Sequence, residues 1–269
     1  VIVYRFVYGL GAATNLSQTN PWGIWIGFDM LAGVALVAGG YTLATSVYIF
    51  GLKEYHPIVR PAILTGFLGY LFAVLGLTAD LGRPWNLPVP LFISWGGPSV
   101  MFEIAWCVVL YLTVLGLEFL PPVFEWLGWK KALVLATRAT IGLTVVGVML
   151  STLHQSSLGG LFLMAPTKLH PLWYSPFIPA YFFISSIAAG LAMVIVESGL
   201  SHRAFKSRVD HHVNLDKLVV GLARGASIVL FAYFFLKVQG VADSGRWSLL
   251  ATGWGYWFLV EVLGFILLP

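Results

Sequence analysis

The chain has 269 residues, of which 59% are hydrophobic and 10% are charged, and its formal net charge is +4. Soluble domains carry about 25% charged residues, so this composition leaves too few charges to cover a water-exposed surface and excludes an ordinary soluble protein. A surface that faces the lipid bilayer removes that requirement. The basic residues lie between apolar runs, where loop charges set membrane topology, so no nucleic-acid partner is expected.

Seven predominantly apolar segments follow one another along the chain, each long enough for the roughly 20 residues of a membrane-spanning helix. They predict spanning helices at about 23–50, 58–79, 98–120, 132–153, 175–199, 215–237 and 249–268. The predicted fold is therefore an all-α polytopic transmembrane helix bundle, with residues 1–269 forming a single integral membrane domain. Because the chain begins at Val1 and stops at Pro269 directly after an apolar run, we expect a piece of a longer protein.

The basic residues between these segments predict an orientation. The connections after the first, third and fifth segments contain Lys53, Arg60, Lys130, Lys131, Arg203, Lys206, Arg208 and Lys217. The connections after the second, fourth and sixth contain Arg83, Lys168, Lys237 and Arg246. Because cytoplasmic loops carry an excess of Lys and Arg, the first set is predicted to be cytoplasmic. The region before the first helix and the loops at 80–97, 154–174 and 238–248 then face outward.

Ionisable side chains inside the bilayer are costly, so each is a candidate for a pathway or a site. The predicted helices contain Asp29, Glu103, Arg138, Glu197, Arg224 and Glu261. Arg138 and Arg224 could snorkel to the interface or pair with Glu197 and so hold helices together. Asp29 and Glu103 lie in the outward halves of their helices, beside further polar motifs, and a functional role is favoured for these two.

Four polar, tryptophan-rich motifs are predicted to meet at the outward face. They are Asn20-Pro21-Trp22-Gly23, Asp80-Leu81-Gly82-Arg83-Pro84-Trp85, His154-Gln155-Ser156-Ser157-Leu158-Gly159 and His170-Pro171-Leu172-Trp173. Such a rim suits a pocket for an amphipathic ligand. His154 can donate a hydrogen bond to a carbonyl and pass a proton near neutral pH. The simpler alternatives are a helix-terminal histidine favoured by the helix dipole and an Asp80–Arg83 loop salt bridge.

Metal and haem chemistry are disfavoured within this chain. Cys107 is the single cysteine, so the chain alone can form neither a disulfide nor a Cys-ligated iron–sulfur cluster or zinc site, and no metal site is predicted. A haem held in a helix bundle usually needs two axial histidines from the helices. All six histidines fall outside the predicted spanning segments, although His154 and His170 could meet at the outward face.

At these motifs the sequence resembles the NrfD/PsrC family of integral membrane quinone-reacting subunits, and within it the HybB-type membrane subunits of hydrogenase-2-type complexes. The residues that carry the resemblance are Asn20–Asp29, His56–Pro61, Asp80–Asn86, Phe102-Glu103, Leu117–Phe119, Leu127–Lys130, His154–Gly159 and Lys168–Trp173. The likeness covers nearly the whole chain and is looser beyond about residue 200.

The resemblance implies a multi-pass subunit of the bacterial cytoplasmic membrane that has no haem or iron–sulfur cluster of its own. Such subunits bind menaquinone or a similar quinone near the periplasmic face. A four-cluster ferredoxin-like iron–sulfur subunit docks there, and a periplasmic catalytic subunit such as a nickel–iron hydrogenase lies beyond it. Some relatives are thought to move protons by intramembrane carboxylates, for which Asp29, Glu103, Glu197 and Glu261 are candidates here.

We therefore predict a site for the quinone headgroup that comprises Trp22, Gly23, Asp80, Arg83, His154 and Gln155. His154 would hydrogen-bond a quinone oxygen and relay a proton, while Asp80, Asp29 and Glu103 connect the site to a proton source. Two alternatives use the same residues differently. A secondary transporter or proton channel would need no redox partner, and a haem b-bearing subunit would show a cytochrome absorption spectrum.

Overall fold

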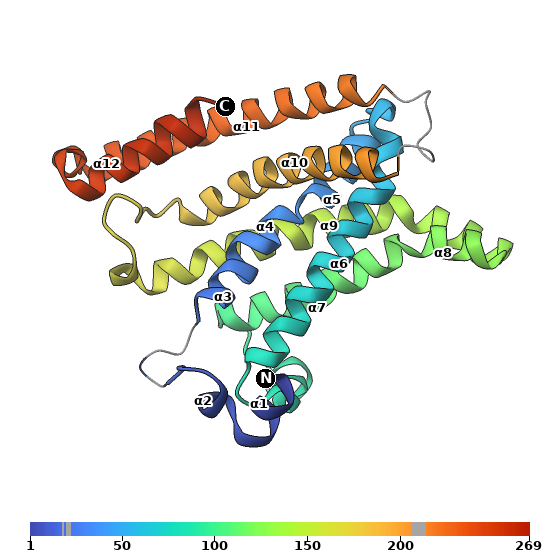
Figure 1. Ribbon diagram of the computed structural model, residues 1–269, viewed down its shortest axis with the longest axis horizontal. Coiled ribbons are helices and arrows are strands. Elements are labelled where there is room, and N and C mark those ends of the chain that lie inside the picture. The colour runs from blue at the N-terminus through green and yellow to red at the C-terminus, as the bar shows by residue number, and fades with distance from the viewer. Residues whose placement is uncertain (18, 20–22, 206–213) are drawn as a thin grey trace.

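Six long apolar helical segments dominate the computed structural model, which describes residues 1–17, 19, 23–205 and 214–269 (Figure 1). These spans are Ile24–Ile49, Lys53–Asp80, Val100–Leu127, Lys130–Met164, Ile178–Ala204 and Leu215–Ser244. A shorter apolar helical segment, Gly253–Leu267, follows them, and no strand occurs in the described ranges. The chain is thus an integral multi-pass membrane protein with the predicted helical bundle architecture.

The long regular helices are α6 (His56–Asp80), α7 (Val100–Glu118), α9 (Lys130–Met164), α10 (Ile178–Ala204) and α11 (Leu215–Ser244). Their ends agree with the predicted segments to within a few residues, except at α9 and α11. α9 continues to Met164 instead of ending near 153, because its first helix-breaking residue is Pro166 and the polar side chains of 154–159 are largely buried against neighbouring helices. α11 continues to Ser244, where Gly245 ends it with a φ of 63°.

The last predicted helix is broken. The chain instead forms η7 (Trp247–Ala251), α12 (Gly253–Leu259) and the π-helical η8 (Val260–Leu267). The α12–η8 segment folds back beside α11 (Figure 1). Leu172, Val241, Phe258, Val262 and Ile266 form a buried cluster that joins it to α11.

The first span is irregular. It consists of α3 (Ile24–Gly27), the π-helical η1 (Phe28–Gly33), α4 (Val34–Leu36), α5 (Gly39–Ala44) and the π-helical η2 (Thr45–Ile49). Wider π turns are frequent at functional sites because they re-aim side chains within an otherwise continuous helix. Here η1 contains Asp29 and contributes Leu31 and Ala32 to the cavity described below.

Close backbone contacts fix the first span and α9 against α10. A Cβ on Gly39 would lie 2.5 Å from the carbonyl oxygen of Gly190, and one on Gly190 would lie 2.3 Å from the nitrogen of Gly39. Gly159 of α9 is equally tight, since its Cβ would lie 2.8 Å from the carbonyl oxygen of Ile178. Small residues at such crossings let membrane helices pack without the hydrophobic effect.

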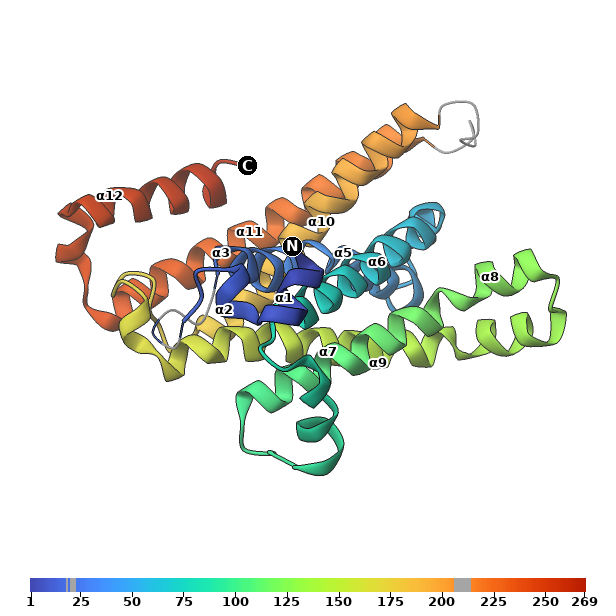
Figure 2. The same ribbon diagram turned by 60° about the horizontal axis from the view of Figure 1, so that its bottom comes forward.

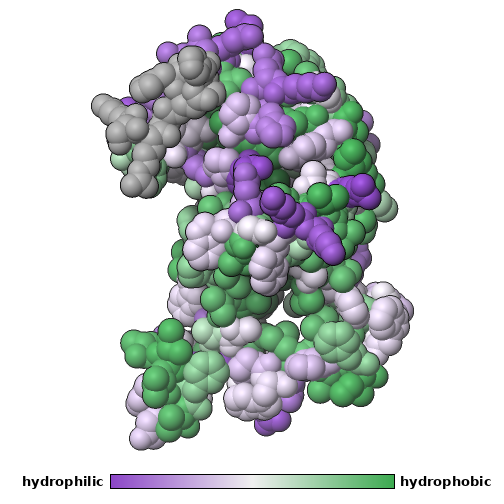
Figure 3. Space-filling model, turned by 90° about the vertical axis from the view of Figure 1, so that its right-hand side faces the viewer, coloured by the Kyte–Doolittle hydropathy of each residue, from purple (hydrophilic) through white to green (hydrophobic). Residues whose placement is uncertain are grey.

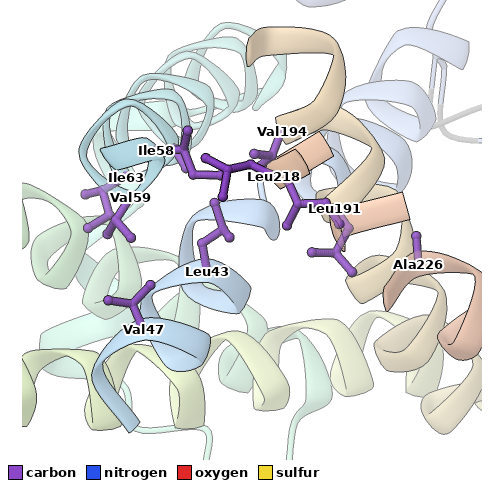
Figure 4. Close-up of a cluster of buried hydrophobic side chains, with 11 residues drawn as sticks. Leu43, Val47, Ile58, Val59, Ile63, Leu191, Val194, Leu218 and Ala226 are labelled. Carbon is purple, nitrogen blue, oxygen red and sulfur yellow. The ribbon is translucent and has the colours of Figure 1, made fainter. Parts of the chain in front are cut away.

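Beyond these crossings, toward the predicted cytoplasmic end, the first span, α6, α10 and α11 share an apolar core. Leu43, Val47, Ile58, Val59, Ile63, Leu191, Val194, Leu218 and Ala226 point toward one another there (Figure 4). The core lies in the half of the bundle predicted to face the cytoplasm. It leaves the opposite half, between the beginning of the first span and the end of α11, for a cavity.

The predicted cytoplasmic end is hydrophilic. α8 (Leu120–Leu127) projects there, and hydrophilic side chains gather when the bundle is viewed from this end (Figure 3). Ion pairs of Arg60 with Glu125 at 3.3 Å and of Lys217 with Glu54 at 3.1 Å tie neighbouring connections together. Lys237, expected in an outward loop, instead lies inside α11 with 7% of its surface exposed, so it does not count toward the loop charges.

At the other end, the short helices α1 (Ile2–Tyr8) and α2 (Leu10–Ala13) precede the first span, and the buried Arg5 donates a hydrogen bond to the carbonyl oxygen of Leu81. The segment between α6 and α7 contains η4 (Pro84–Asn86) and η5 (Val89–Ile93) and extends away from the bundle (Figure 2). Its exposed Trp85, Phe92 and Trp95 are typical of the membrane interface.

Candidate functional site

A cavity of about 320 Å³ lies between the first span, α9, α10, α11 and the connection from α9 to α10. Its wall is mostly apolar and aromatic, and includes Leu31, Phe162, Trp173, Tyr181, Phe182 and Tyr233. Gln155 and Lys237 add hydrogen-bonding groups to the same wall. An apolar cavity of this size with a few convergent polar groups is typical of a small-molecule site.

Lys237 belongs to a buried charged cluster in this wall. Its Nζ donates a hydrogen bond to Oε1 of Glu261, which lies on η8, over 3.1 Å. The other carboxylate oxygen of Glu261 accepts a hydrogen bond of 2.5 Å from the indole Nε1 of Trp173. The ammonium also lies 5.6 Å from the ring centres of Tyr181 and Tyr233, within the range of cation–π attraction.

The connection between α9 and α10 contributes Leu169 and Trp173 to the cavity wall, at the end opposite the predicted cytoplasmic side. It contains η6 (Pro166–Lys168) and is fixed by Arg246, which donates hydrogen bonds to the carbonyl oxygens of Pro171 and Tyr174 over 2.5 and 3.4 Å. The Tyr181 hydroxyl donates to the carbonyl oxygen of Leu236 over 2.8 Å, which joins α10 to α11. These contacts hold Trp173 in position beside Lys237.

His154 and Gln155 are more deeply buried than the sequence predicts. They were expected to end a helix at an outward rim, but both lie inside α9, with exposures of 0% and 1%. The expectation that no histidine lies within a spanning helix is therefore wrong for His154. The Ile104 backbone lies beside its imidazole and Tyr70 meets the ring edge-on at 5.8 Å.

Several polar atoms around this point are buried and have no hydrogen-bond partner of normal geometry among the described residues. They include both ring nitrogens of His154, both amide atoms of Gln155, the hydroxyls of Tyr41, Tyr70 and Tyr111, and Oγ of Ser151. Buried polar atoms normally have a partner. Because the Gln155 side chain also lines the cavity, its unpaired amide is a group that a bound ligand can satisfy.

Glu103 is connected to the His154 region through α9. Ser157, one turn beyond His154, donates a hydrogen bond of 2.6 Å to Oε1 of Glu103 on α7. The Glu103 side chain is exposed on the surface of the isolated chain, whereas Ser157 is buried. The structure thus brings Glu103 next to the predicted motif, as a group between that motif and the outer surface of α7.

Among the described side chains, none of the remaining predicted residues forms a hydrogen bond with His154. Asp29 is half-buried and points toward α6, where its Oδ2 lies 3.5 Å from the position of a Cβ on Gly76. Asp80 ends α6 and is half-buried, while Arg83 is exposed. No ion pair joins Asp80 to Arg83 among the described side chains. Gly23 begins the first span, and Trp22 lies outside the described residues.

Glu197 does not pair with an arginine in the described part of the chain, although the sequence suggested such a pair within the membrane. Glu197 accepts a hydrogen bond of 2.6 Å from Thr65 on α6, and not from Arg138 or Arg224, which are both exposed. The described residues contain no group of three His, Cys, Asp or Glu side chains that could hold a metal ion. His56 and His202 lie in the end turns of α6 and α10, which leaves His154 as the interior histidine of a described helix.

Sequence reasoning missed Lys237, Tyr181 and Tyr233 as wall residues. The signal for Lys237 was a lysine at the edge of an apolar run, which we assigned to a loop because α11 was expected to end there. It also missed Glu118, which accepts a hydrogen bond of 2.8 Å from Thr144 of α9. Glu118 lines a second cavity, of about 280 Å³, at the predicted cytoplasmic end, together with His56 and Arg60.

Known proteins with similar sequences test the resemblance to the NrfD/PsrC family. The family model described as "Polysulphide reductase, NrfD" matches residues 12–269. A protein of Nitratidesulfovibrio vulgaris is 55% identical over 269 residues, which cover 99% of this chain and 69% of the relative. The probable Ni/Fe-hydrogenase 2 b-type cytochrome subunit of Escherichia coli is 36% identical over 269 residues, covering 98% of this chain and 67% of the relative.

A third relative is the integral membrane subunit of menaquinone reductase from Nitratidesulfovibrio vulgaris. It is 33% identical over 166 residues, which cover 57% of this chain and 38% of the relative. No solved structure matches the chain. The family match over residues 12–269 and the similarity to the hydrogenase-2 subunit over 98% of this chain confirm the resemblance drawn from the motifs, and the chain belongs to the NrfD family.

Proposed function

We propose that this chain is the quinone-reacting membrane subunit of a bacterial respiratory oxidoreductase. It exchanges electrons between an external iron–sulfur subunit and menaquinone or a related quinone. The observation that carries the proposal is the aromatic cavity with the buried, unpaired amide of Gln155 in its wall. The names of two relatives, a hydrogenase-2 subunit and a menaquinone reductase subunit, support the same class.

A quinone headgroup is a flat, apolar ring with carbonyl oxygens that accept hydrogen bonds. Trp173, Tyr181 and Phe182 offer aromatic surfaces to the ring, and the Gln155 amide nitrogen can donate to one carbonyl oxygen. The isoprenoid tail, which partitions into lipid, would leave sideways between helices. Reduction consumes two electrons and two protons, so the site also needs a proton supply.

His154 adjoins Gln155 and is the group we propose to relay a proton to the quinone oxygen. Its ring nitrogens have no hydrogen-bond partner of normal geometry among the described residues, so they can take part in the relay. Ser157, one turn along α9, and Glu103 on α7 would connect it to the surface. Asp29 and Asp80 would lie on the outer part of the same path for protons. Gly23, Arg83 and Trp22 are proposed to border the headgroup at the outward side.

The partners follow from the same reasoning. A four-cluster ferredoxin-like iron–sulfur subunit would dock on the outward, periplasmic face, and a periplasmic catalytic subunit such as a nickel–iron hydrogenase would supply or receive its electrons. Turnover is proposed to be coupled to proton translocation through the intramembrane carboxylates. The described carboxylates occur at both ends of the bundle, with Glu103 near one end of α7 and Glu118 at the other, which supports protonation from either side.

The test is a His154→Ala substitution in the complete membrane complex. Quinone-linked turnover should fall at least about 100-fold, the usual contribution of a positioned acid–base group, while dye-linked activity of the partner stays within about twofold. His202→Ala, at an exposed helix end, is the matched control. Unchanged quinone turnover in the His154→Ala complex would remove His154 from the site, and a complex that carries no quinone and no iron–sulfur partner would favour a transporter or channel instead.

A haem-bearing subunit is the second candidate, because one relative is named as a b-type cytochrome subunit. His154 is the interior histidine that could ligate such a group, but its ring is packed against Tyr70. We expect that His154→Ala substitution removes no b-type absorption band from the spectrum of the purified complex. A band that does disappear would identify His154 as an axial ligand and not as a proton relay.

A further inference from the structure

The buried ammonium of Lys237 is a part of the cavity wall that the proposed reaction has not yet used. An ammonium carries three N–H donors. In the described part of the chain, its one hydrogen bond goes to Glu261, over 3.1 Å. Because Lys237 lines the cavity and is 7% exposed, its remaining donors are available to a molecule bound in the cavity.

The surroundings of Lys237 hold its side chain in one position. Glu261 is itself fixed by the 2.5 Å hydrogen bond from Trp173, and Tyr181, Tyr233 and Phe258 place their ring centres 5.6 to 5.7 Å from Nζ. A carboxylate and aromatic faces both attract an ammonium group, so these contacts fix the position of Nζ. The charges of Lys237 and Glu261 balance each other in this ion pair. The wall therefore suits a neutral ligand, and the ammonium can stabilise negative charge that develops on the ligand during the reaction.

We propose that Lys237 donates a hydrogen bond to the second carbonyl oxygen of the quinone headgroup, opposite the oxygen bound by Gln155. This inference rests on the proposed function. Two electrons from the iron–sulfur partner enter the ring, negative charge develops on the carbonyl oxygens, and two protons from the relay complete the hydroquinone. Lys237 keeps its own proton and stabilises the developing charge. Glu261 and Trp173 are positioning residues that aim the ammonium.

A group that interacts more strongly with the charged intermediate than with the neutral quinone acts mainly on kcat. Lys237→Met in the complete complex should therefore lower quinone-linked kcat about 10- to 100-fold, the range for a hydrogen bond from a charged donor, and change KM less than about threefold. The semiquinone signal in a poised electron paramagnetic resonance titration should disappear. Lys217→Met is the matched control, because Lys217 is also on α11 and also pairs with a glutamate at 3.1 Å, but is exposed at the other end.

Removing Lys237 alone leaves Glu261 without its cation, which can destabilise the fold. The double variant Lys237→Met/Glu261→Leu removes both charges and should assemble, since apolar replacement of a buried ion pair is often neutral. It should show the same loss of kcat. Trp173→Phe keeps an aromatic ring and removes the hydrogen bond to Glu261, so its kcat should lie between those of wild type and Lys237→Met.

The outcomes separate this inference from the function it rests on. Wild-type kcat and semiquinone signal in Lys237→Met, with loss of turnover in His154→Ala or Gln155→Ala, would overturn the role of Lys237 and leave the quinone site standing. Wild-type quinone turnover in all three variants would overturn the proposed function as well. Failure of both Lys237→Met and the double variant to assemble would mark the ion pair as structural and overturn the inference.

Discussion

The carboxylate of Glu103 on α7 accepts a hydrogen bond from the hydroxyl of Ser157 on α9, with the two oxygens 2.6 Å apart. This contact lies one turn along α9 from the buried His154, and its carboxylate lies at the surface of the isolated chain. It joins two of the predicted motifs by a direct hydrogen bond.

Glu103→Gln should slow quinone turnover without preventing assembly. The amide is nearly isosteric and can still accept the Ser157 hydrogen bond, but it cannot carry a proton. We expect quinone-linked turnover to fall at least about tenfold, measured under saturating quinone, with dye-linked activity unchanged. Glu125→Gln, an exposed carboxylate at the other end of the bundle, is the control. Equal turnover of Glu103→Gln and wild type would exclude Glu103 from the proton supply.

Gly190→Ala should destabilise the bundle. Its Cβ would lie 2.3 Å from a backbone atom of the first span, which cannot move aside as a flexible side chain could. We expect a loss of about 1–3 kcal/mol, seen as a lower Tm in detergent and reduced yield. Gly199→Ala is the matched control on the same helix, since nothing lies within 4 Å of its Cβ. Equal Tm values for the two variants would show that the helices separate easily.

Arg246→Met should weaken quinone binding more than chemistry. Arg246 holds the α9–α10 connection through the carbonyl oxygens of Pro171 and Tyr174, and that connection positions Trp173 in the cavity wall. We expect KM for quinone to rise about 3- to 10-fold, corresponding to one or two lost hydrogen bonds, with kcat changed less than about twofold. Steady-state kinetics with a soluble quinone analogue would measure both. A fall in kcat at constant KM would contradict this prediction.

Labelling of introduced cysteines should establish the orientation. The native Cys107 is buried, so background labelling is expected to be low. Trp95→Cys, 74% exposed, should react with a membrane-impermeant maleimide from the periplasm, and Trp126→Cys, 85% exposed, only after the cells are opened. The opposite pattern would reverse the topology that the loop charges predict, and would place the cavity at the cytoplasmic side.

The helical architecture could be predicted because lipid imposes it on any long apolar segment. Hydropathy says little about where a helix ends when polar side chains continue it, and this is why α9 was expected to stop before His154. The polar residues 154–159 resembled a loop in composition, but they are compatible with a helix whose inner face is packed on α7 and α10. The same error placed Lys237 outside α11.

The candidate site was predicted in part. His154 and Gln155 were singled out by residue type, and the structure shows them buried with unpaired polar atoms. The Lys237–Glu261–Trp173 cluster was beyond prediction, because its members are separated by 24 to 88 residues and meet only through the fold-back of η8. The irregularity of the first span could not be predicted either, because π turns depend on tertiary packing and not on the local amino-acid composition.

The π turn at Phe28–Gly33 sets the direction of the Asp29 side chain independently of how the rest of the first span packs. A π turn holds one residue more per turn than an α-helix, so a one-residue deletion there can be absorbed by return to regular α geometry. The flanking segments would keep their packing faces, while Asp29 would rotate away from Gly76. Relatives that differ by a single residue at this place would therefore share the bundle and lack the carboxylate at this position.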